Sequence, residues 1–150
     1  MMTNNTLQAL FVAFAFLVQV LLIINFVARN WKPSLERKHG WLLYAMVGTL
    51  GLILGILFLA GDQPWYIVAA PLISSIWAAF GYYVDTYRQI EWRSPPRWPV
   101  FIPYVGLFMA SQFFFWIPLW YIGLEYWIAY SAMYFINTGL NIYSHRKTES

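Results

Sequence analysis

The stretch that decides the fold is residues 99–144, PVFIPYVGLFMASQFFFWIPLWYIGLEYWIAYSAMYFINTGLNIYS, whose single charged residue is Glu125. Its 46 residues, at about 1.5 Å of helix each, are roughly twice as long as a bilayer is thick. A helical chain of this length must therefore turn once. Pro118 and Gly123 disfavour a helix, and tryptophans and tyrosines, which prefer the headgroup level, cluster around them. These signals place the turn at 121–123, between spans at 99–120 and 124–144.

Three more stretches without a charge, each long enough to cross a bilayer, lie upstream at 7–28, 41–60 and 65–84. The whole chain is 61% hydrophobic and 10% charged, whereas soluble domains are about 25% charged. This composition excludes a soluble single domain, a disordered chain and a nucleic-acid-binding module. The sequence predicts an all-α polytopic transmembrane bundle of five spans, forming a single domain over residues 1–150. The alternative has four spans, with part of 99–144 lying along the membrane interface.

The positions of the charges predict the orientation of this bundle. All nine Lys and Arg residues lie in 29–40, in 85–98 and after residue 144, whereas the segments 61–64 and 121–125 carry only Asp62 and Glu125. With five spans, every basic residue falls on one side, and the positive-inside rule makes that side cytoplasmic. We therefore expect a multi-pass protein of the cell membrane with its N-terminus outside and its C-terminus in the cytoplasm.

Small residues predict which spans pack together. The second span carries Gly51 and Gly55 at a spacing of four, and the third carries a face of small residues, which are Ala70, Ser74, Ala78 and Gly81. Small residues allow helices in lipid to approach closely. We expect these two spans to pack on each other, and the alternative is a homodimer face.

Uncharged polar side chains at mid-depth are the candidate ligand-binding residues. The fifth span places Tyr126, Tyr130, Tyr134, Asn137 and Asn141 on one helical face, at steps of four, four, three and four. One interpretation is hydrogen bonding between helices; the other is the wall of a pocket for a mostly apolar molecule. The predicted ligand-binding set is Gln19, Ser74, Gln112, Tyr130, Tyr134, Asn137 and Asn141.

The cytoplasmic loops mix bases with aromatic residues. Basic residues there attract anionic lipid headgroups, so the predicted contacts to anionic lipid are Arg29, Lys32, Arg88, Arg93 and Arg97. The chain has no cysteine, which excludes disulfides and thiolate metal sites. A haem or chlorophyll would need an axial ligand, for which His39 and His145 are the candidates. Because a solvated histidine at the interface is the ordinary case, we expect no such cofactor and no metal site.

Three short strings resemble those of the tryptophan-rich sensory or translocator proteins: WLLYAMVG at 41–48, PPRW at 95–98 and TGLN at 138–141. Membership would imply a helical bundle that binds porphyrins or sterol-like ligands. In that family, however, the Pro-Pro loop precedes the second span, and here it precedes the fourth. We therefore do not assign the chain to this family.

The function that these patterns favour is a non-enzymatic binder or carrier of a lipidic or flat aromatic molecule. One alternative is an accessory or scaffold subunit of a larger membrane complex. Another is an enzyme acting on a lipid at the cytoplasmic interface, with Asp85, Glu91 or His145 as acid or base. No group of residues shows catalytic spacing, so the sequence leans against an enzyme. The expected partners are membrane lipids, a hydrophobic small molecule, and a second copy or another membrane protein, but not nucleic acid.

Overall fold

The computed structural model describes residues 4–149, with side chains described as far as Arg146. Within this range every regular element is a helix, and the only β-type pairing is an isolated bridge between Arg93 and Pro96. In chain order the elements are α1 (Asn4–Trp31), α2 (Pro33–His39), α3 (Trp41–Ala60), α4 (Trp65–Gly81), η1 (Tyr82–Tyr87), α5 (Trp98–Ile122) and α6 (Leu124–Glu149). The short helix α2 was not predicted, and η1 is a π-helical turn that continues α4.

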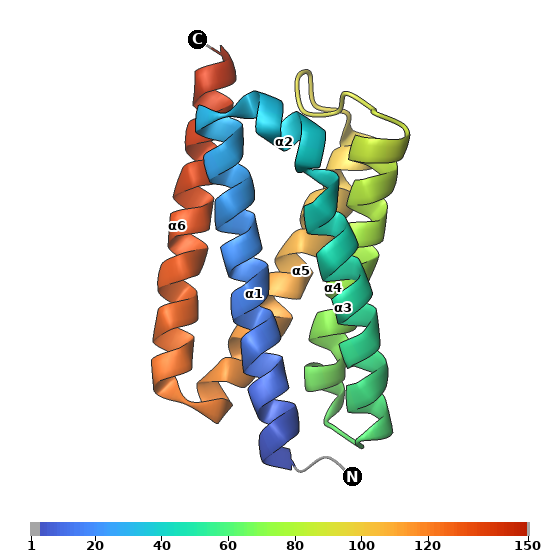
Figure 1. Ribbon diagram of the computed structural model, residues 1–150, viewed down its shortest axis with the longest axis vertical. Helices are drawn as coiled ribbons and strands as arrows, with labels where there is room; N and C mark the ends of the chain where they lie inside the picture. Colours follow the sequence, from blue (N-terminus) through green and yellow to red (C-terminus); the bar gives the residue numbers. More distant parts are fainter. Residues whose placement is uncertain (1–3, 150) are drawn as a thin grey trace.

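The long helices form two pairs joined by a diagonal helix (Figure 1). The α3–α4 hairpin makes one side of the molecule, and α1 packs along α6 on the other side. Helix α5 runs obliquely between the pairs, from α4 at one end of the bundle to α6 at the opposite end. The two helix pairs are therefore connected through α5, which contacts α4 and α6.

Four of these helices are long and apolar enough to cross a membrane: α1, α3, α4 together with η1, and α5. The chain is thus a helical, aromatic-rich membrane protein. Helix α6 has 26 residues, more than the roughly 20 that a bilayer requires, but its stripe of polar residues makes it less hydrophobic. Five spans, their orientation and the kind of membrane remain predictions.

The packing of α3 on α4 is as close as the small residues predict. An ideal Cβ atom on Gly51 would lie 2.6 Å from the backbone oxygen of Pro71, and one on Gly55 would lie 2.3 Å from a methyl carbon of Leu72. The Ser75 hydroxyl donates a hydrogen bond to the backbone oxygen of Gly48 at 2.9 Å. This face of α3 is therefore occupied by α4 of the same chain.

We predict that Gly51→Ala lowers the free energy of unfolding in detergent by about 1–3 kcal/mol, because a methyl group would overlap a backbone oxygen that cannot move away easily. The matched control is Gly139→Ala on α6, where an added Cβ has nothing within 4 Å. That change should leave stability unchanged or raise it by up to about 1 kcal/mol, because alanine favours a helix. Equal thermal unfolding of the two variants would contradict the α3–α4 packing.

The turn between α5 and α6 falls within the predicted range. Helix α5 continues through Pro118 and ends at Ile122, and α6 begins at Leu124 after the single residue Gly123. The rings of Trp116 and Trp127 stack across the hairpin, with centroids 5.4 Å apart. The indole N–H of Trp116 also donates to the Ser131 hydroxyl at 2.7 Å. Aromatic stacking therefore closes this end of the hairpin.

Candidate functional site

A cavity lies where α5 moves away from α6. It has a volume of about 460 Å³ and is bounded by α1, α5 and α6, with Trp77 of α4 and the loop 88–97 contributing to its wall. We call it the inner cavity. Its apolar wall includes Leu22, Phe26, Phe101, Val105, Phe108 and Ile142. A volume of this size is typical of sites that bind small molecules.

A second, wider cavity of about 950 Å³ adjoins the first at the basic end of the molecule. We call it the outer basin, and it is bounded by α2, η1, the loop 88–97 and the ends of α1 and α6. The two cavities share lining residues, which are Asn25, Arg29, Leu43, Trp92, Arg93 and His145. The inner cavity therefore connects the depth of the bundle with its basic end.

A network of hydrogen bonds marks the deep end of the inner cavity. The Asn137 side-chain N–H donates to the side-chain oxygen of Gln19, and the Gln19 side-chain N–H donates to that of Gln112. The Tyr130 hydroxyl donates to the same Gln112 oxygen at 2.7 Å. All four side chains are buried, with at most 4% of their surface exposed. This amide network, as we call it, ties α1, α5 and α6 together at one depth.

The predicted ligand-binding residues therefore divide into three groups. Four of them line the inner cavity: Gln19, Tyr134, Asn137 and Asn141. Gln112 and Tyr130 belong to the amide network and stand behind the cavity wall. Ser74 lies elsewhere, buried in α4, where its hydroxyl donates to the backbone oxygen of Ala70 at 2.8 Å. The polar stripe of α6 thus serves both as a helix contact and as a cavity wall.

Two buried polar atoms on residues of this wall have no hydrogen-bond partner within the described part of the chain: the indole N–H of Trp77 and the side-chain oxygen of Asn137. The Trp77 ring packs between Tyr44 and Phe108, with ring centroids 5.5 Å and 5.4 Å away. A buried donor or acceptor without a partner costs about 1–3 kcal/mol. Both atoms belong to residues of the cavity wall, but each is itself buried, with almost no exposed surface.

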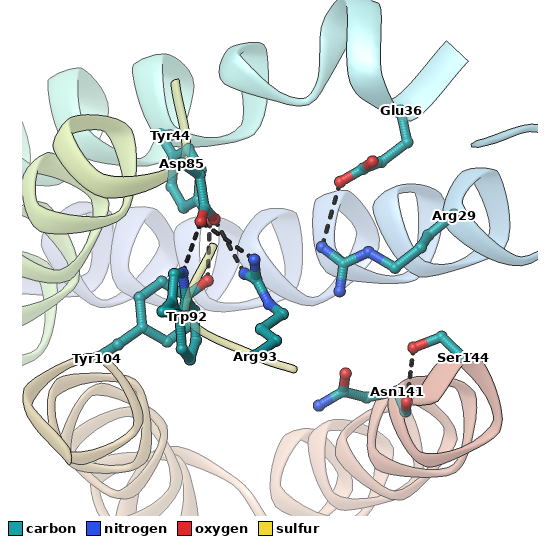
Figure 2. A network of polar contacts seen from close by, with 9 residues as sticks. All are labelled: Arg29, Glu36, Tyr44, Asp85, Trp92, Arg93, Tyr104, Asn141 and Ser144. Carbon is teal, nitrogen blue, oxygen red and sulfur yellow. Dashed lines mark hydrogen bonds and ion pairs between the residues drawn. The ribbon is translucent and has the colours of Figure 1, made fainter. Parts of the chain in front are cut away.

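Asp85 of η1 is the centre of a second polar cluster, which anchors the loop 88–97 (Figure 2). Its carboxylate accepts the indole N–H of Trp92 at 2.8 Å and both terminal N–H groups of Arg93 at 3.1 and 2.9 Å. The Tyr44 hydroxyl also donates to it, and because the Tyr44 proton is used in this way, the Tyr104 hydroxyl, 2.9 Å away, donates to Tyr44.

Arg93, the cation of this cluster, stacks on an aromatic ring in addition to its ion pair with Asp85. The Arg93 guanidinium carbon lies 4.1 Å from the centroid of the Trp92 ring. Burial alone would lower the pKa of Arg93, but its hydrogen bonds to Asp85 raise that pKa above its usual value. Arg93 therefore stays charged, and its charge is neutralised by Asp85 within the protein.

The other predicted contacts to anionic lipid lie in different surroundings. Lys32, Arg88 and Arg97 are exposed, and contact with lipid headgroups remains a prediction for them. Arg29 pairs with Glu36 at 3.2 Å and lines both cavities. The histidines are also placed differently from each other.

Both histidines are exposed, His39 on α2 and His145 on the wall shared by the two cavities. No group of three or more metal-ligating side chains occurs in the described residues. The three residues considered as acid or base, Asp85, Glu91 and His145, all line the outer basin. The Asp85 carboxylate is already occupied by donors from three side chains.

Sequence reasoning missed the Asp85 cluster and the inward position of Trp77. The signal for the first was the presence of Asp85 and Glu91 among the bases and tryptophans of 85–98, a pattern that also fits a solvated loop. Comparison of this chain with protein-family models, with curated proteins and with solved structures finds no match. The short strings that resemble the tryptophan-rich proteins thus gain no support from a family match.

We predict that Asp85→Asn makes the loop 88–97 more susceptible to trypsin, because Arg93 loses the ion pair that holds it. Removing one partner of such a pair costs about 1–3 kcal/mol. The matched control is Asp62→Asn, an exposed residue between α3 and α4. Limited proteolysis in detergent should show faster cleavage after Arg88, Arg93 or Arg97 only in the first variant, and equal rates would contradict the anchoring role of Asp85.

Proposed function

We propose that this chain is a five-span protein of the cell membrane that binds or carries a lipidic or flat aromatic molecule without transforming it. The observation that carries the proposal is the inner cavity of about 460 Å³, with apolar and aromatic walls and a few uncharged polar side chains such as Asn25, Tyr134 and Asn141. Apolar walls with a few polar groups are typical of sites that bind hydrophobic ligands.

The depth of the cavity supports a ligand taken from the membrane. Gln19, Phe26 and Arg29 all line it from α1, and ten residues of helix span about 15 Å. The cavity therefore extends along about half the thickness of a bilayer's apolar core, which is about 30 Å. A molecule that occupies it keeps most of its surface out of water.

The charge distribution supports the proposed orientation. The described basic residues lie on α2, on the loop 88–97 and near the ends of α1 and α6 that meet these segments (Figure 1). The connection between α3 and α4, at the opposite end, carries Asp62. The positive-inside rule then assigns the outer basin to the cytoplasmic side.

Cysteine labelling tests this topology, because the native chain has no cysteine. We predict that a membrane-impermeant thiol reagent applied to intact cells modifies Gln63→Cys, between α3 and α4, and spares Ser94→Cys, in the loop after η1. After the cells are opened, both positions should react. Equal labelling of both in intact cells would show that the five-span topology is wrong.

Filling the inner cavity tests the binding function. Tyr134 lines the cavity and its hydroxyl donates only to the sulfur of Met109, at 3.6 Å, whereas Phe135 is 67% exposed on the same helix. We predict that Tyr134→Trp lowers several-fold the amount of lipid or small molecule that co-purifies, because the larger ring narrows the cavity. Phe135→Trp adds bulk outside it and should leave that amount unchanged.

Native mass spectrometry of the gently purified proteins provides the measurement. Tyr134→Phe provides a second variant, which keeps the ring and should lower binding by about 0.5–1.5 kcal/mol if the hydroxyl contacts the ligand. A wild-type protein that carries no ligand, with variants that differ from it only in thermal unfolding, would contradict the binder and favour a subunit of a larger complex.

A further inference from the structure

The charges on the inner cavity have a single sign. Among its described lining residues the ionised or readily ionised groups are Arg29, Arg93 and His145, and none of the residues there is an aspartate or a glutamate. The acids near the site, Glu36, Asp85 and Glu91, line the outer basin instead. The lining of the inner cavity therefore carries cationic side chains at its mouth, and the carboxylates that pair with the two arginines lie on the side of the outer basin.

The two arginines differ in what they can still bind. Both terminal nitrogens of Arg93 donate to Asp85, and its flat face covers Trp92. The only side-chain hydrogen bond of Arg29 to a described residue is the one to Glu36, at 3.2 Å. A guanidinium has several further N–H donors in a planar fork that matches a carboxylate or a phosphate. Arg29 is therefore the cation that can take an anionic group.

Arg29 also stands directly above an apolar path. Leu22 and Phe26 share its face of α1, at steps of four and three, and both line the inner cavity. The guanidinium carbon of Arg29 lies 5.5 Å from the centroid of the Phe26 ring. Below these residues the amide network closes the path at Gln19. The cavity thus has Arg29, with N–H donors still available, at its mouth, followed by a mostly apolar path about 15 Å long.

We propose that the ligand of the inner cavity is an anionic amphiphile, a carboxylate or phosphate head on an apolar chain, whose head binds Arg29 and whose chain extends toward the amide network. This inference rests on the proposed binding function and names its ligand class. Glu36 occupies Arg29 in the absence of such a ligand, so the carboxylate of Glu36 and the ligand head compete for the same guanidinium.

The test compares oleate with methyl oleate, which has the same chain and no charge. Equilibrium binding to the purified chain in non-ionic detergent at pH 8 should favour oleate by about tenfold, the range of a charge-assisted hydrogen bond. Arg29→Gln should bring the ratio of the two affinities close to one, with binding of the ester unchanged. Glu36→Gln should raise the affinity for oleate several-fold, since it removes the competitor.

The matched control is Lys38→Gln, an exposed residue of α2 that lines neither cavity. It removes one positive charge from the same end of the molecule and should keep the tenfold preference. If Lys38→Gln abolishes the preference as Arg29→Gln does, the effect is a general attraction to positive charge and the proposal is wrong. If Arg29→Gln does not fold, Glu36→Gln provides the test. The proposal is then wrong if the ratio of the oleate affinity to the methyl oleate affinity is the same in Glu36→Gln as in the native protein.

Two further ligands distinguish the sources of the anion. Lysophosphatidic acid carries a phosphate on one chain, and inorganic phosphate carries no chain. Competition with oleate by lysophosphatidic acid, but not by inorganic phosphate at the same concentration, supports an amphiphile with either head. Equal competition by inorganic phosphate overturns it in favour of a simple anion site. If oleate and its ester bind equally well, this inference is wrong but the proposed function stands. If neither of them binds, the proposed function itself is wrong.

Discussion

The hydrogen bonds that join Gln19, Gln112 and Asn137 are the interaction on which the rest of the structure depends. A side-chain amide in the apolar depth of a membrane is costly unless its donors and acceptors are paired. These three amides come from α1, α5 and α6, and they pair with one another. One amide network therefore sets the depth and the rotation of three helices. On one side of it the α5–α6 hairpin stays closed, and on the other side α5 crosses to α4 (Figure 1). The inner cavity lies where the two helices diverge.

The pairing of helices was predictable wherever a pattern allowed one partner only. The apolar length of 99–144 required a turn, and Gly123 provides it. The glycines of α3 required a neighbour with small residues, which α4 provides. The oblique course of α5 was not predictable, because the residue pattern of a single helix does not show which of its turns contact which neighbouring helix. The inner cavity follows from that course. The sequence therefore identified the polar stripe of α6, but it could not say which of its residues contact another helix and which line a cavity.

The Asp85 cluster shows a second limit of sequence reasoning. An acid and a base eight positions apart, Asp85 and Arg93, read as ordinary charges of a solvated loop. The structure brings them together because the π-helical turn η1 places Asp85 next to Tyr44, and the loop 88–97 turns so that Trp92 and Arg93 both donate to Asp85. The contact joins α3, α5 and the loop through Tyr44 and Tyr104. Its residues line both cavities, so the same cluster holds the loop and shapes the boundary between water and the bundle interior.

The polar stripe of α6 forms helix contacts at one depth of the bundle and a cavity wall at another. At Tyr130 and at the N–H side of Asn137, the hydrogen-bonding groups are used between helices, as expected of contacts that hold a bundle together. One turn further along, at Asn141, and then at His145, α5 has moved away, and the same face lines a cavity. Tyr134 and Asn137 lie at the boundary. Tyr134 lines the cavity while its hydroxyl contacts Met109 of α5, and Asn137 lines it while its N–H groups bind Gln19. The inner cavity thus separates α5 from α6 over this length, and the amphiphile that we propose as its ligand would contact both helices at once.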